Sequence, residues 1–392
     1  MRRILMLGLL LMCGFVVFGQ THQHGTATTG DGQFNPFLAA DKRAGFYLVF
    51  VQRINNVCNV MLRHSADGKV FSAPVRVNDR ESDATVRNEN PPKVAVAPNG
   101  DVYVCWANER GRWKGNIRFA RSTDGGKSFS PAITLNSDGD AEPAGHAFQS
   151  LAVDAKGKIF VAWIDERNKR QEDRGAEIRL ATSENGGKSF SPDRRILTDV
   201  CECCRTNLQA DAAGKLYLTY RTVPRTGPMY RDIILARSLD GGRTFTTALA
   251  SEDKWEIAGC PVAGPSFSLD AAGNPTAVWF LGGGERPGLY YATSANSGAS
   301  FAPRRLLDPQ QKLGKHAHTV SLPNGEILIA WDEAAEQTVS YWGILNPLTG
   351  LQRRSPPQEG IAYPVAATNG HTAVIAGQRL ATREIVIFTE HP

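Results

Sequence analysis

The sequence predicts an all-β fold, a β-propeller of four-stranded antiparallel blades. Three observations support this prediction. The chain of 392 residues contains 38 Gly and 22 Pro, which suits many short strands joined by tight turns. A short box of about eight residues recurs five times at intervals of about 55–60 residues, a period typical of repeat folds. An apolar hairpin recurs between the boxes, so each unit supplies four strands, as a propeller blade does.

Each box begins with Ser and has an Asp or Asn two residues later, then Gly and an aromatic residue. The Asp or Asn side chain can accept hydrogen bonds from backbone amides of its own turn. The Gly permits a positive φ, and we expect the aromatic ring to wedge between strands. This structural role is assigned to Asp67, Asp124, Asn185, Asp240 and Asn296, in the boxes that begin at Ser65, Ser122, Ser183, Ser238 and Ser294.

The apolar hairpins predict the number of blades. In each hairpin a short apolar strand and a turn ending in Gly precede a strongly apolar strand that ends in an aromatic residue, as in VAVAPNGDVYVCW at 94–106. The same template fits 37–51, 151–163, 208–220, 267–279, 320–331 and, more loosely, 364–375. Counting hairpins therefore predicts seven blades.

The N-terminus has the pattern of a secretory signal peptide over residues 1–19, with two arginines, a short apolar run and a small-residue end. The run is shorter than the roughly 20 residues of a transmembrane helix, so we expect no membrane span. Residues 20–33 are predicted to be a flexible segment or the outer strand that closes the last blade. Residues 34–392 are predicted to form one propeller domain, secreted or periplasmic after cleavage.

The charge of the chain excludes nucleic acid as a partner. The formal net charge is +5, and removal of Arg2 and Arg3 with the signal would leave +3. No run of Lys or Arg alternates with aromatic residues, as a nucleic-acid groove requires. We expect a monomer whose partner is a glycan or a small anionic ligand.

One face of the predicted propeller carries the long loops. The hairpin turns and the boxes lie on one face, and the remaining loops and the connections between blades lie on the other. Such loops on a rigid scaffold commonly bind ligands, and Arg grips carboxylates with paired hydrogen bonds. A self-neutralising rim is the alternative, since 165–175 has four acidic and four basic residues. The candidate ligand-binding residues are Arg110, Arg167, Arg205, Arg221, His146 and His318.

The boxes resemble the Asp-box, or BNR repeat, of the sialidase superfamily, whose pattern is S-x-D-x-G-x-[ST]-[FW]. The copies at Ser122 and Ser238 match it fully. The resemblance implies a sialidase-like propeller that recognises a glycan-like or anionic ligand, with exo-sialidase-type glycoside hydrolysis as the leading enzymatic possibility. Sialidases have six blades, which is the alternative to seven.

The resemblance also suggests catalytic residues. Enzymes of the superfamily hold the sugar carboxylate with three arginines and use a Tyr–Glu nucleophile and an Asp acid. The first arginine belongs to an Arg-Ile-Pro motif, whereas residues 35–38 here are Asn-Pro-Phe-Leu. Whether the protein is an enzyme stays open for this reason. Weak catalytic candidates are Asp165, Glu166, Tyr230 and Glu333.

Six cysteines remain after the predicted signal, and an even number in an exported protein favours disulfides. The motif Cys201-x-Cys203-Cys204 with Cys260 resembles a signature of a bacterial secreted subset of sialidase-like propellers. We expect Cys260 to pair with one cysteine of the motif and the other two to pair locally. A further bridge between Cys58 and Cys105 depends on their separation.

A second function class is based on the same cysteines. Thiolates of Cys201, Cys203, Cys204 and Cys260, with His316 or His318, could bind copper or zinc, although their spacing matches no known zinc site. The vicinal pair Cys203–Cys204 could instead form a labile, redox-active disulfide. The sequence therefore leaves two alternatives: a glycan-recognising propeller, or a Cys/His metal-binding or redox protein on a propeller scaffold.

Overall fold

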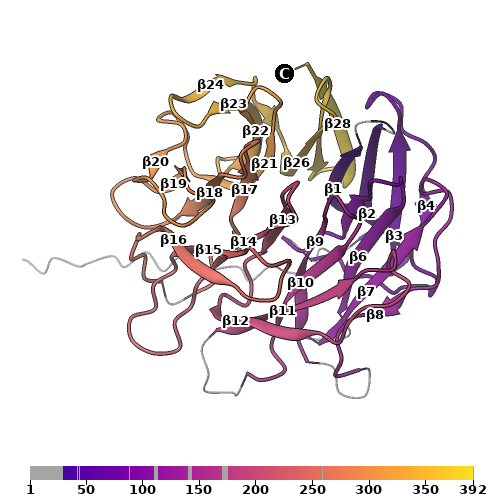
Figure 1. Ribbon diagram of the computed structural model, residues 1–392. Coiled ribbons are helices and arrows are strands. Elements are labelled where there is room, and N and C mark those ends of the chain that lie inside the picture. Colours follow the sequence, from indigo (N-terminus) through magenta and orange to yellow (C-terminus); the bar gives the residue numbers. More distant parts are fainter. Residues whose placement is uncertain are drawn as a thin grey trace, which may run out of the picture.

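The computed structural model describes residues 30–391, except 42, 44, 88, 110–113, 140–143, 170–174 and 258. Within this part the chain forms seven antiparallel sheets arranged around a central channel (Figure 1). Each sheet is a blade made from one continuous segment, with its first strand lining the channel. The all-β seven-bladed propeller is confirmed, and the six-bladed alternative is wrong. Among the described residues, no helix has the length and hydrophobicity needed to cross a bilayer.

Blades 1 to 4 contain four strands each. Blade 1 comprises β1 (Gly32–Asp41), β2 (Gly45–Ile54), β3 (Val57–Ser65) and β4 (Val75–Arg76), and blade 2 comprises β5 (Lys93–Val96), β6 (Val102–Glu109), β7 (Gly115–Ser122) and β8 (Ile133–Thr134). Blade 3 comprises β9 (His146–Val153), β10 (Ile159–Asp165), β11 (Ala176–Ser183) and β12 (Arg194–Val200), and blade 4 comprises β13 (Asn207–Ala210), β14 (Leu216–Arg221), β15 (Ile233–Ser238) and β16 (Thr246–Ser251).

The last three blades vary more in strand number. Blade 5 comprises β17 (Ser266–Leu269), β18 (Pro275–Leu281), β19 (Gly288–Thr293) and β20 (Arg305–Leu306). Blade 6 comprises β21 (Gly314–Ser321), β22 (Ile327–Glu333), β23 (Val339–Asn346) and β24 (Gly350–Arg354), and the short β25 (Gln358–Glu359) also pairs with β23. Blade 7 comprises β26 (Ile361–Thr368), β27 (Ala373–Arg379) and β28 (Glu384–Glu390).

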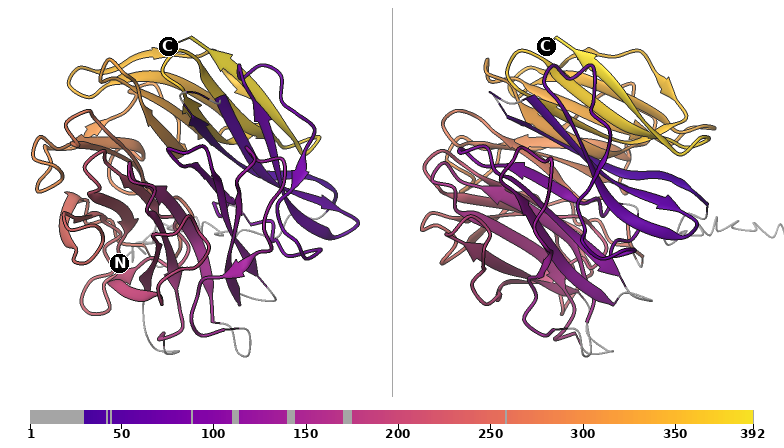
Figure 2. Two further views of the ribbon diagram at one scale, coloured as in Figure 1. Left: turned by 45° about the vertical axis from the view of Figure 1, so that its right-hand side comes forward. Right: turned by 90° about the vertical axis from the view of Figure 1, so that its right-hand side faces the viewer.

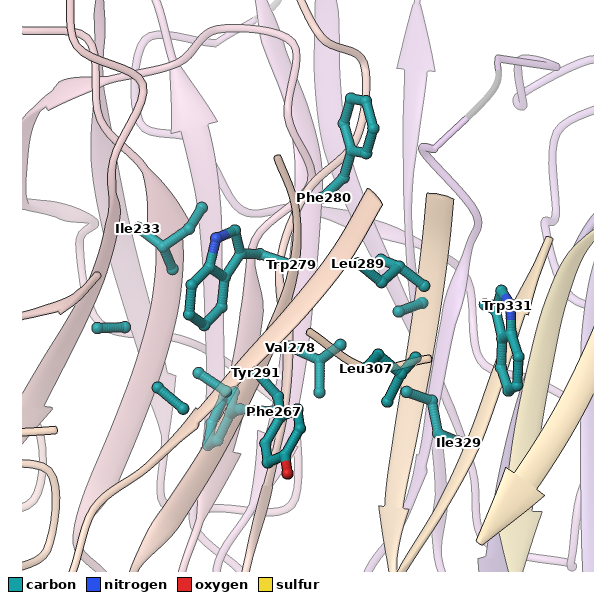
Figure 3. Close-up of a cluster of buried hydrophobic side chains, with 14 of the residues drawn as sticks. Ile233, Phe267, Val278, Trp279, Phe280, Leu289, Tyr291, Leu307, Ile329 and Trp331 are labelled. Atoms are coloured by element: carbon teal, nitrogen blue, oxygen red, sulfur yellow. The ribbon is translucent and has the colours of Figure 1, made fainter. Parts of the chain in front are cut away.

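The second strand of each blade is buried on both faces, because blades pack against one another on either side. Strands β10, β18 and β22 have no exposed residue, which explains their nearly continuous apolar runs. The indoles of Trp279 and Trp331 belong to one cluster that joins blades 4, 5 and 6 (Figure 3). In five of the seven predicted hairpins the final aromatic residue is thus an interblade core residue: Trp106, Trp163, Tyr220, Trp279 and Trp331.

Each box is a closed hydrogen-bonded turn between the third and fourth strands of blades 1 to 5. In the box of blade 2, the Ser122 hydroxyl donates to Asp124 at 2.6 Å and accepts from Gly126 N at 2.8 Å. Asp124 also accepts the backbone N–H groups of Lys127 and Ser128. The hydroxyl groups of Ser122 and Ser128, followed by these backbone bonds, lower the pKa of its carboxyl group. The other four boxes repeat the bonds between the Ser hydroxyl, the Asp or Asn and the Gly amide.

The box aromatic residues pack between blades rather than between strands of one blade. Phe190 of the blade 3 box contacts Phe119 of blade 2, with ring centroids 4.8 Å apart. Phe129 of the blade 2 box packs against the cluster that includes Tyr47 and Leu62 of blade 1. Each box thus attaches its own blade to the preceding one.

Replacing Gly187 by Ala is expected to lower the free energy of unfolding by about 2–5 kcal/mol. Gly187 has φ of 75°, and a Cβ there would lie 2.6 Å from the Phe119 ring. The left-handed conformation costs an L-residue about 1–2 kcal/mol, and overpacking adds about 1–3 kcal/mol. Gly157→Ala is the matched control, since Gly157 has φ of 83° but nothing within 4 Å of its Cβ. Urea denaturation of both variants separates the cost of backbone strain from the cost of the clash with Phe119. Equal losses of unfolding free energy in the two variants would contradict the interblade contact.

The ring closes where the first blade meets the last (Figure 2). Gln33 N donates to Arg383 O at 2.7 Å, and Ile385 N donates to the Gln33 side chain at 3.2 Å. Thr389 of β28 donates to the carbonyl of Gly68 in the first box at 3.3 Å. Gly32 and Gln33 belong to β1, whereas residues 20–29 and the predicted signal peptide lie outside the described residues. The described parts of blades 1 and 7 therefore join by side-by-side packing.

Candidate functional site

Four inner strands carry a bulge where they begin on the loop-rich face. The register between first and second strands shifts there in blades 1, 3, 6 and 7. Near each shift a non-glycine residue has positive φ: Asn35 (54°), Phe148 (55°), His316 (50°) and Tyr363 (53°). A bulge re-aims a side chain relative to the regular alternation of a strand. We call this end of the channel the channel mouth, and define it by Asn35, Glu89, Phe148, Arg205, His316 and Tyr363.

A buried ion pair spans the channel mouth. Arg205 Nε lies 3.2 Å from Glu89 Oε2, and the two side chains are 10% and 2% exposed. The same carboxylate oxygen accepts a hydrogen bond from Gly264 N at 3.0 Å, and Arg205 Nη2 donates to the carbonyl of Ala317. These contacts connect blades 2, 4, 5 and 6. The predicted ligand-binding Arg205 therefore lies at the mouth, but its guanidinium is already engaged.

His316 is the mouth residue best placed for proton transfer. Its Nδ1 lies 2.8 Å from Asp332 Oδ1, and its ring lies against the Tyr363 ring with centroids 4.5 Å apart. Asp332 also accepts the backbone N–H of Tyr363 at 2.9 Å, which ties the two bulges together. Burial acts to lower the pKa of His316, but Asp332 and Glu89 outweigh it, so the pKa is raised. With Nδ1 held by Asp332, Nε2 is the nitrogen that can exchange a proton with a ligand.

The central channel contains a cavity of about 730 Å³, which is lined by the inner strands of all seven blades. Lys93, Arg205 and His318 line it together with Phe37. Lys93 Nζ lies 4.1 Å from the centroid of the Phe37 ring, and the His318 ring meets Phe37 edge-on at 5.5 Å. The predicted His318 therefore faces the channel interior, whereas His316 belongs to the mouth.

Burial shifts two of these groups toward their neutral forms. Burial, together with the charge of Arg205, lowers the pKa of Lys93 to about 7. Burial and the charges of Arg205 and Lys93 lower the pKa of His318 to about 3. The His318 Nδ1 atom accepts a hydrogen bond from Ala366 N at 3.3 Å, which a neutral ring can do.

Lys93→Met is expected to stabilise the protein by a few kcal/mol at pH 7, with a pH dependence of defined sign. Lys93 has a folded pKa of about 7, against about 10.4 in an unfolded chain. The unfolded chain therefore binds the proton more tightly, and wild-type stability falls as pH drops from about 10 to about 7. Thermal unfolding of both proteins across this range should show a difference in stability that widens toward pH 7. A constant difference in stability across this range would contradict the lowered pKa of Lys93.

The acidic and basic residues of the blade 3 loop form a closed network. Asp165 is fully buried and accepts hydrogen bonds from Trp163 Nε1 at 2.9 Å and Arg167 Nη2 at 2.8 Å. His146 bridges Asp138 and Asp165, at 2.9 and 3.2 Å. Arg167 and His146 are therefore satisfied within the protein. Neighbouring Glu166 is half-buried, and burial raises its pKa.

The remaining predicted residues also have internal partners. Arg221 is fully buried and donates to the carbonyls of Arg231, Phe280 and Ala263. Glu333 is buried and accepts from Trp331 Nε1 at 3.0 Å, as Asp165 does from Trp163. Tyr230 forms a backbone bridge with Glu256. Arg110 lies outside the described residues. Of the catalytic and ligand-binding candidates, the described structure brings Arg205 and His318 to the channel.

Sequence reasoning missed Glu89, Lys93 and Asp332. Lys93 begins the inner strand β5, and Asp332 lies near the end of the second strand β22. In both places a charged residue interrupts the apolar pattern of the strand. That interruption was the available signal for Lys93 in KVAV and for Asp332 in ILIAWDE. Glu89 lies before β5 and outside any strand pattern, so only the assembled ring shows that it pairs with Arg205.

The four cysteines of the motif come together behind the mouth. Cys203 and Cys260 form a disulfide with Cα atoms 6.5 Å apart, while Cys201 and Cys204 are buried free thiols. The local disulfide expected between the other two motif cysteines is therefore not formed. The further bridge between Cys58 and Cys105 is also absent, since both are free thiols. The four sulfurs lie within 4.8 Å of one another, and among the described side chains this set includes neither His316 nor His318. The predicted vicinal Cys203–Cys204 bond is absent, because Cys203 bonds to Cys260.

Structural comparison finds the same propeller architecture in carbohydrate-active proteins. An ulvan lyase of polysaccharide lyase family PL25 superposes with a TM-score of 0.61 at 11% identity, covering 94% of this chain and 96% of that one. Hadza microbial sialidase Hz136 gives 0.54 at 15% identity, covering 89% and 74%. The NanB sialidase of Streptococcus pneumoniae gives 0.51 at 10% identity, covering 91% and 92%. At these identities the similarity establishes the fold alone.

Sequence comparison identifies the family. No curated protein matches the chain significantly in sequence. The family model described as BNR repeat-like domain matches residues 55–375, which contain all five boxes and most of the seven blades. The resemblance seen in the boxes is thereby confirmed, and the protein belongs to the BNR repeat-like domain family, with a propeller structurally similar to sialidases.

Proposed function

We propose that this protein is a carbohydrate-active propeller that binds an acidic glycan at the channel mouth and uses His316 to exchange a proton with it. The observation that carries the proposal is the His316–Asp332 pair lying against the Tyr363 ring. A carboxylate that holds one imidazole nitrogen fixes the tautomer and presents the other nitrogen to a ligand. Bulges of blades 6 and 7 place this group on the loop-rich face, where the sequence predicted ligand binding.

The charge at the mouth favours an anionic ligand. Asp332 and Glu89 raise the pKa of His316 and so favour its cationic form. The Nζ atom of the adjacent Lys315, whose pKa is lowered by burial, lies 4.9 Å from the centroid of the Phe280 ring. Cations near apolar surface attract carboxylate or sulfate groups more strongly than they would in water. The names of the structural relatives, sialidases and an ulvan lyase of a polysaccharide lyase family, point to the same class of ligand.

The bonding of the carboxylates favours proton transfer by His316 over the paired-carboxylate hydrolysis typical of glycosidases. Glu89 is engaged by Arg205 and Gly264, and Asp332 by His316 and Tyr363 N. The candidates Asp165 and Glu333 are buried within blades 3 and 6. An imidazole can serve elimination from an acidic sugar in two steps. In its neutral form His316 would remove the proton beside the carboxylate, and in the resulting cationic form, which Asp332 stabilises, it would give that proton to the leaving oxygen. The export predicted from the N-terminus would place the protein where such polysaccharides occur.

His316→Gln is expected to lower turnover of an acidic polysaccharide by about 10²–10⁴-fold, the usual contribution of general acid–base catalysis. A panel of uronate-containing and sialylated glycans would be assayed for new double bonds, new reducing ends and free sialic acid. His371→Gln is the matched control, because His371 is an exposed histidine in the β26–β27 turn on the opposite face. Equal activity of the two variants, or no binding of any acidic glycan by the wild type, would refute the proposal.

A further inference from the structure

A group of four cysteines lies outside the channel mouth and takes no part in the proposed glycan chemistry. Cys201 follows the last strand of blade 3, and Cys203 and Cys204 lie in the connection to blade 4. Cys260 lies in the connection from blade 4 to blade 5. Cys201, Cys203 and Cys204 are at most 5% exposed, whereas Cys260 is partly exposed. The group therefore has an inner side and one sulfur near the surface.

The sulfurs are arranged for exchange of disulfide partners. The Sγ atoms of Cys201 and Cys204 are 2.8 Å apart, and these two thiols form a Cys-x-x-Cys pair. The Cys201 Sγ atom also lies 3.7 Å from Cys203 Sγ, one end of the disulfide to Cys260. A dithiol thus contacts a disulfide, which is the arrangement that thiol–disulfide exchange needs.

Two buried arginines supply positive charge beside these sulfurs. Arg231 Nη1 lies 3.5 Å from Cys201 Sγ, and the charge of Arg221 acts on Cys204. Both guanidiniums are bonded to carbonyl groups, and among the described ion pairs neither has an acidic partner. The Nε atoms of both are buried without a hydrogen-bond acceptor. A buried charge is costly unless it is compensated, and a thiolate at Cys201 would compensate these cations.

The two inner thiols are also electrostatically unequal. Burial acts to raise the pKa of Cys201, but the hydrogen bond from Cys204 and the charge of Arg231 lower it overall. The pKa of Cys204 is raised by burial and by its neighbour Cys201. Cys201 is therefore suited to act as the attacking thiolate, whereas Cys204 stays protonated more readily.

We propose that Cys201, Cys203, Cys204 and Cys260 form a dithiol–disulfide relay that passes an electron pair between the buried Cys201–Cys204 pair and a thiol or disulfide compound reaching Cys260. In the first step the Cys201 thiolate attacks Cys203 Sγ. A Cys201–Cys203 bond forms, the Cys203–Cys260 bond breaks, and Cys260 leaves as a thiolate that takes up the proton released by Cys201.

In the second step the Cys204 thiolate attacks Cys201 Sγ. The Cys201–Cys204 bond forms, the Cys201–Cys203 bond breaks, and Cys203 takes up the proton released by Cys204. The number of disulfides is unchanged, and the electron pair has moved outward to Cys203 and Cys260. An external disulfide, such as oxidised glutathione, can then reoxidise this outer pair and is itself reduced to two thiols, so the group can store two disulfides.

The test equilibrates the full-length purified protein in glutathione buffers of graded reduced-to-oxidised ratio. Samples are quenched with acid, alkylated in denaturant and mapped by mass spectrometry. The relay predicts two reversible linkages, Cys201–Cys204 and Cys203–Cys260, and a total capacity of two disulfides. Cys201→Ser is expected to halve this capacity while the Cys203–Cys260 bond still forms. If Cys201 and Cys204 stay reduced in every buffer, the proposal is overturned.

Two variants and a metal measurement complete the test. In oxidised Cys260→Ser, Cys201 should be found bonded to Cys203 or Cys204, whereas an entirely unbonded Cys201 would count against the relay. Cys58→Ser is the matched control, since Cys58 is a free thiol of blade 1, and its linkage map should equal that of wild type. Native mass spectrometry of the reduced protein provides the competing outcome. One tightly held zinc on all four sulfurs would identify a metal site and overturn the relay.

Discussion

Replacing Glu89 by Ala is expected to lower the free energy of unfolding by about 3–5 kcal/mol, the usual cost of leaving one member of a buried ion pair alone. Arg205 would remain in the channel mouth with its nearest counter-charge removed, since its guanidinium lies 3.2 Å from Glu89. Gly264 N would also lose its acceptor. Because the pair and its hydrogen bonds connect blades 2, 4, 5 and 6, urea denaturation of the whole protein should report the loss.

A double variant distinguishes loss of charge pairing from loss of packing. Glu89→Ala combined with Arg205→Met removes both charges, and an apolar replacement of a buried pair is often nearly neutral. The double variant should therefore be more stable than Glu89→Ala alone. If Glu89→Ala lowers the free energy of unfolding by less than about 1 kcal/mol, the pair contributes no more than an ordinary surface salt bridge. That result would contradict the buried position of the pair.

Asp165→Ala is expected to lower the free energy of unfolding by about 3–5 kcal/mol, because it removes the acceptor of a buried indole N–H and several charge-assisted hydrogen bonds at once. Arg167 and His146 keep the carboxylates of Asp193 and Asp138 as partners. Trp163 Nε1 and Arg167 donate to this carboxylate, and His146 Nδ1 lies 3.2 Å away. Thermal or urea unfolding at neutral pH measures the loss. Glu184→Ala is the control, since the Glu184 side chain is 77% exposed and forms a surface ion pair with Lys158, so a change below about 1 kcal/mol is expected.

The effect of Asp165 should depend on pH in one direction. Burial acts to raise its pKa, but the hydrogen bonds with His146 and Arg167 outweigh burial and hold the pKa below its usual value. The stabilisation is therefore present above the unfolded-state pKa of about 3.9 and is lost as pH falls below it. The difference in the free energy of unfolding between wild type and Asp165→Ala should become smaller in acid. A gap that widens in acid would mean that the buried carboxyl is protonated.

The architecture could be predicted from the sequence because each blade repeats a local pattern. The boxes and hairpins depend on neighbouring residues, such as Ser122 with Asp124 and Gly126, and these bonds form wherever the pattern occurs. Even the burial of Trp331 follows from its place at the end of an apolar strand. Seven units with this pattern were sufficient to give seven blades.

The candidate site could not be predicted because its contacts join residues far apart in the chain. Glu89 and Arg205 meet only after the ring has closed, and the bulges at His316 and Tyr363 rotate side chains that a regular strand would place elsewhere. Arg221 shows the opposite case. Its sequence position suggested a ligand, but its guanidinium is fully occupied by backbone carbonyls of three segments. Residue type on a loop-rich face therefore did not distinguish a binding arginine from a structural one.

The contact between a box and the preceding blade has a consequence for how the gene could be rearranged. The first box lies against the last blade, where a Cβ on Gly68 would be 2.5 Å from Val374, so the junction of the two ends uses the same kind of contact as the other box-bearing blades. Stability in such repeat proteins is largely a sum over neighbouring units. A circular permutant that starts between two other blades would keep every one of these contacts. The junction between blades 7 and 1 is therefore one of several junctions at which this ring could be opened.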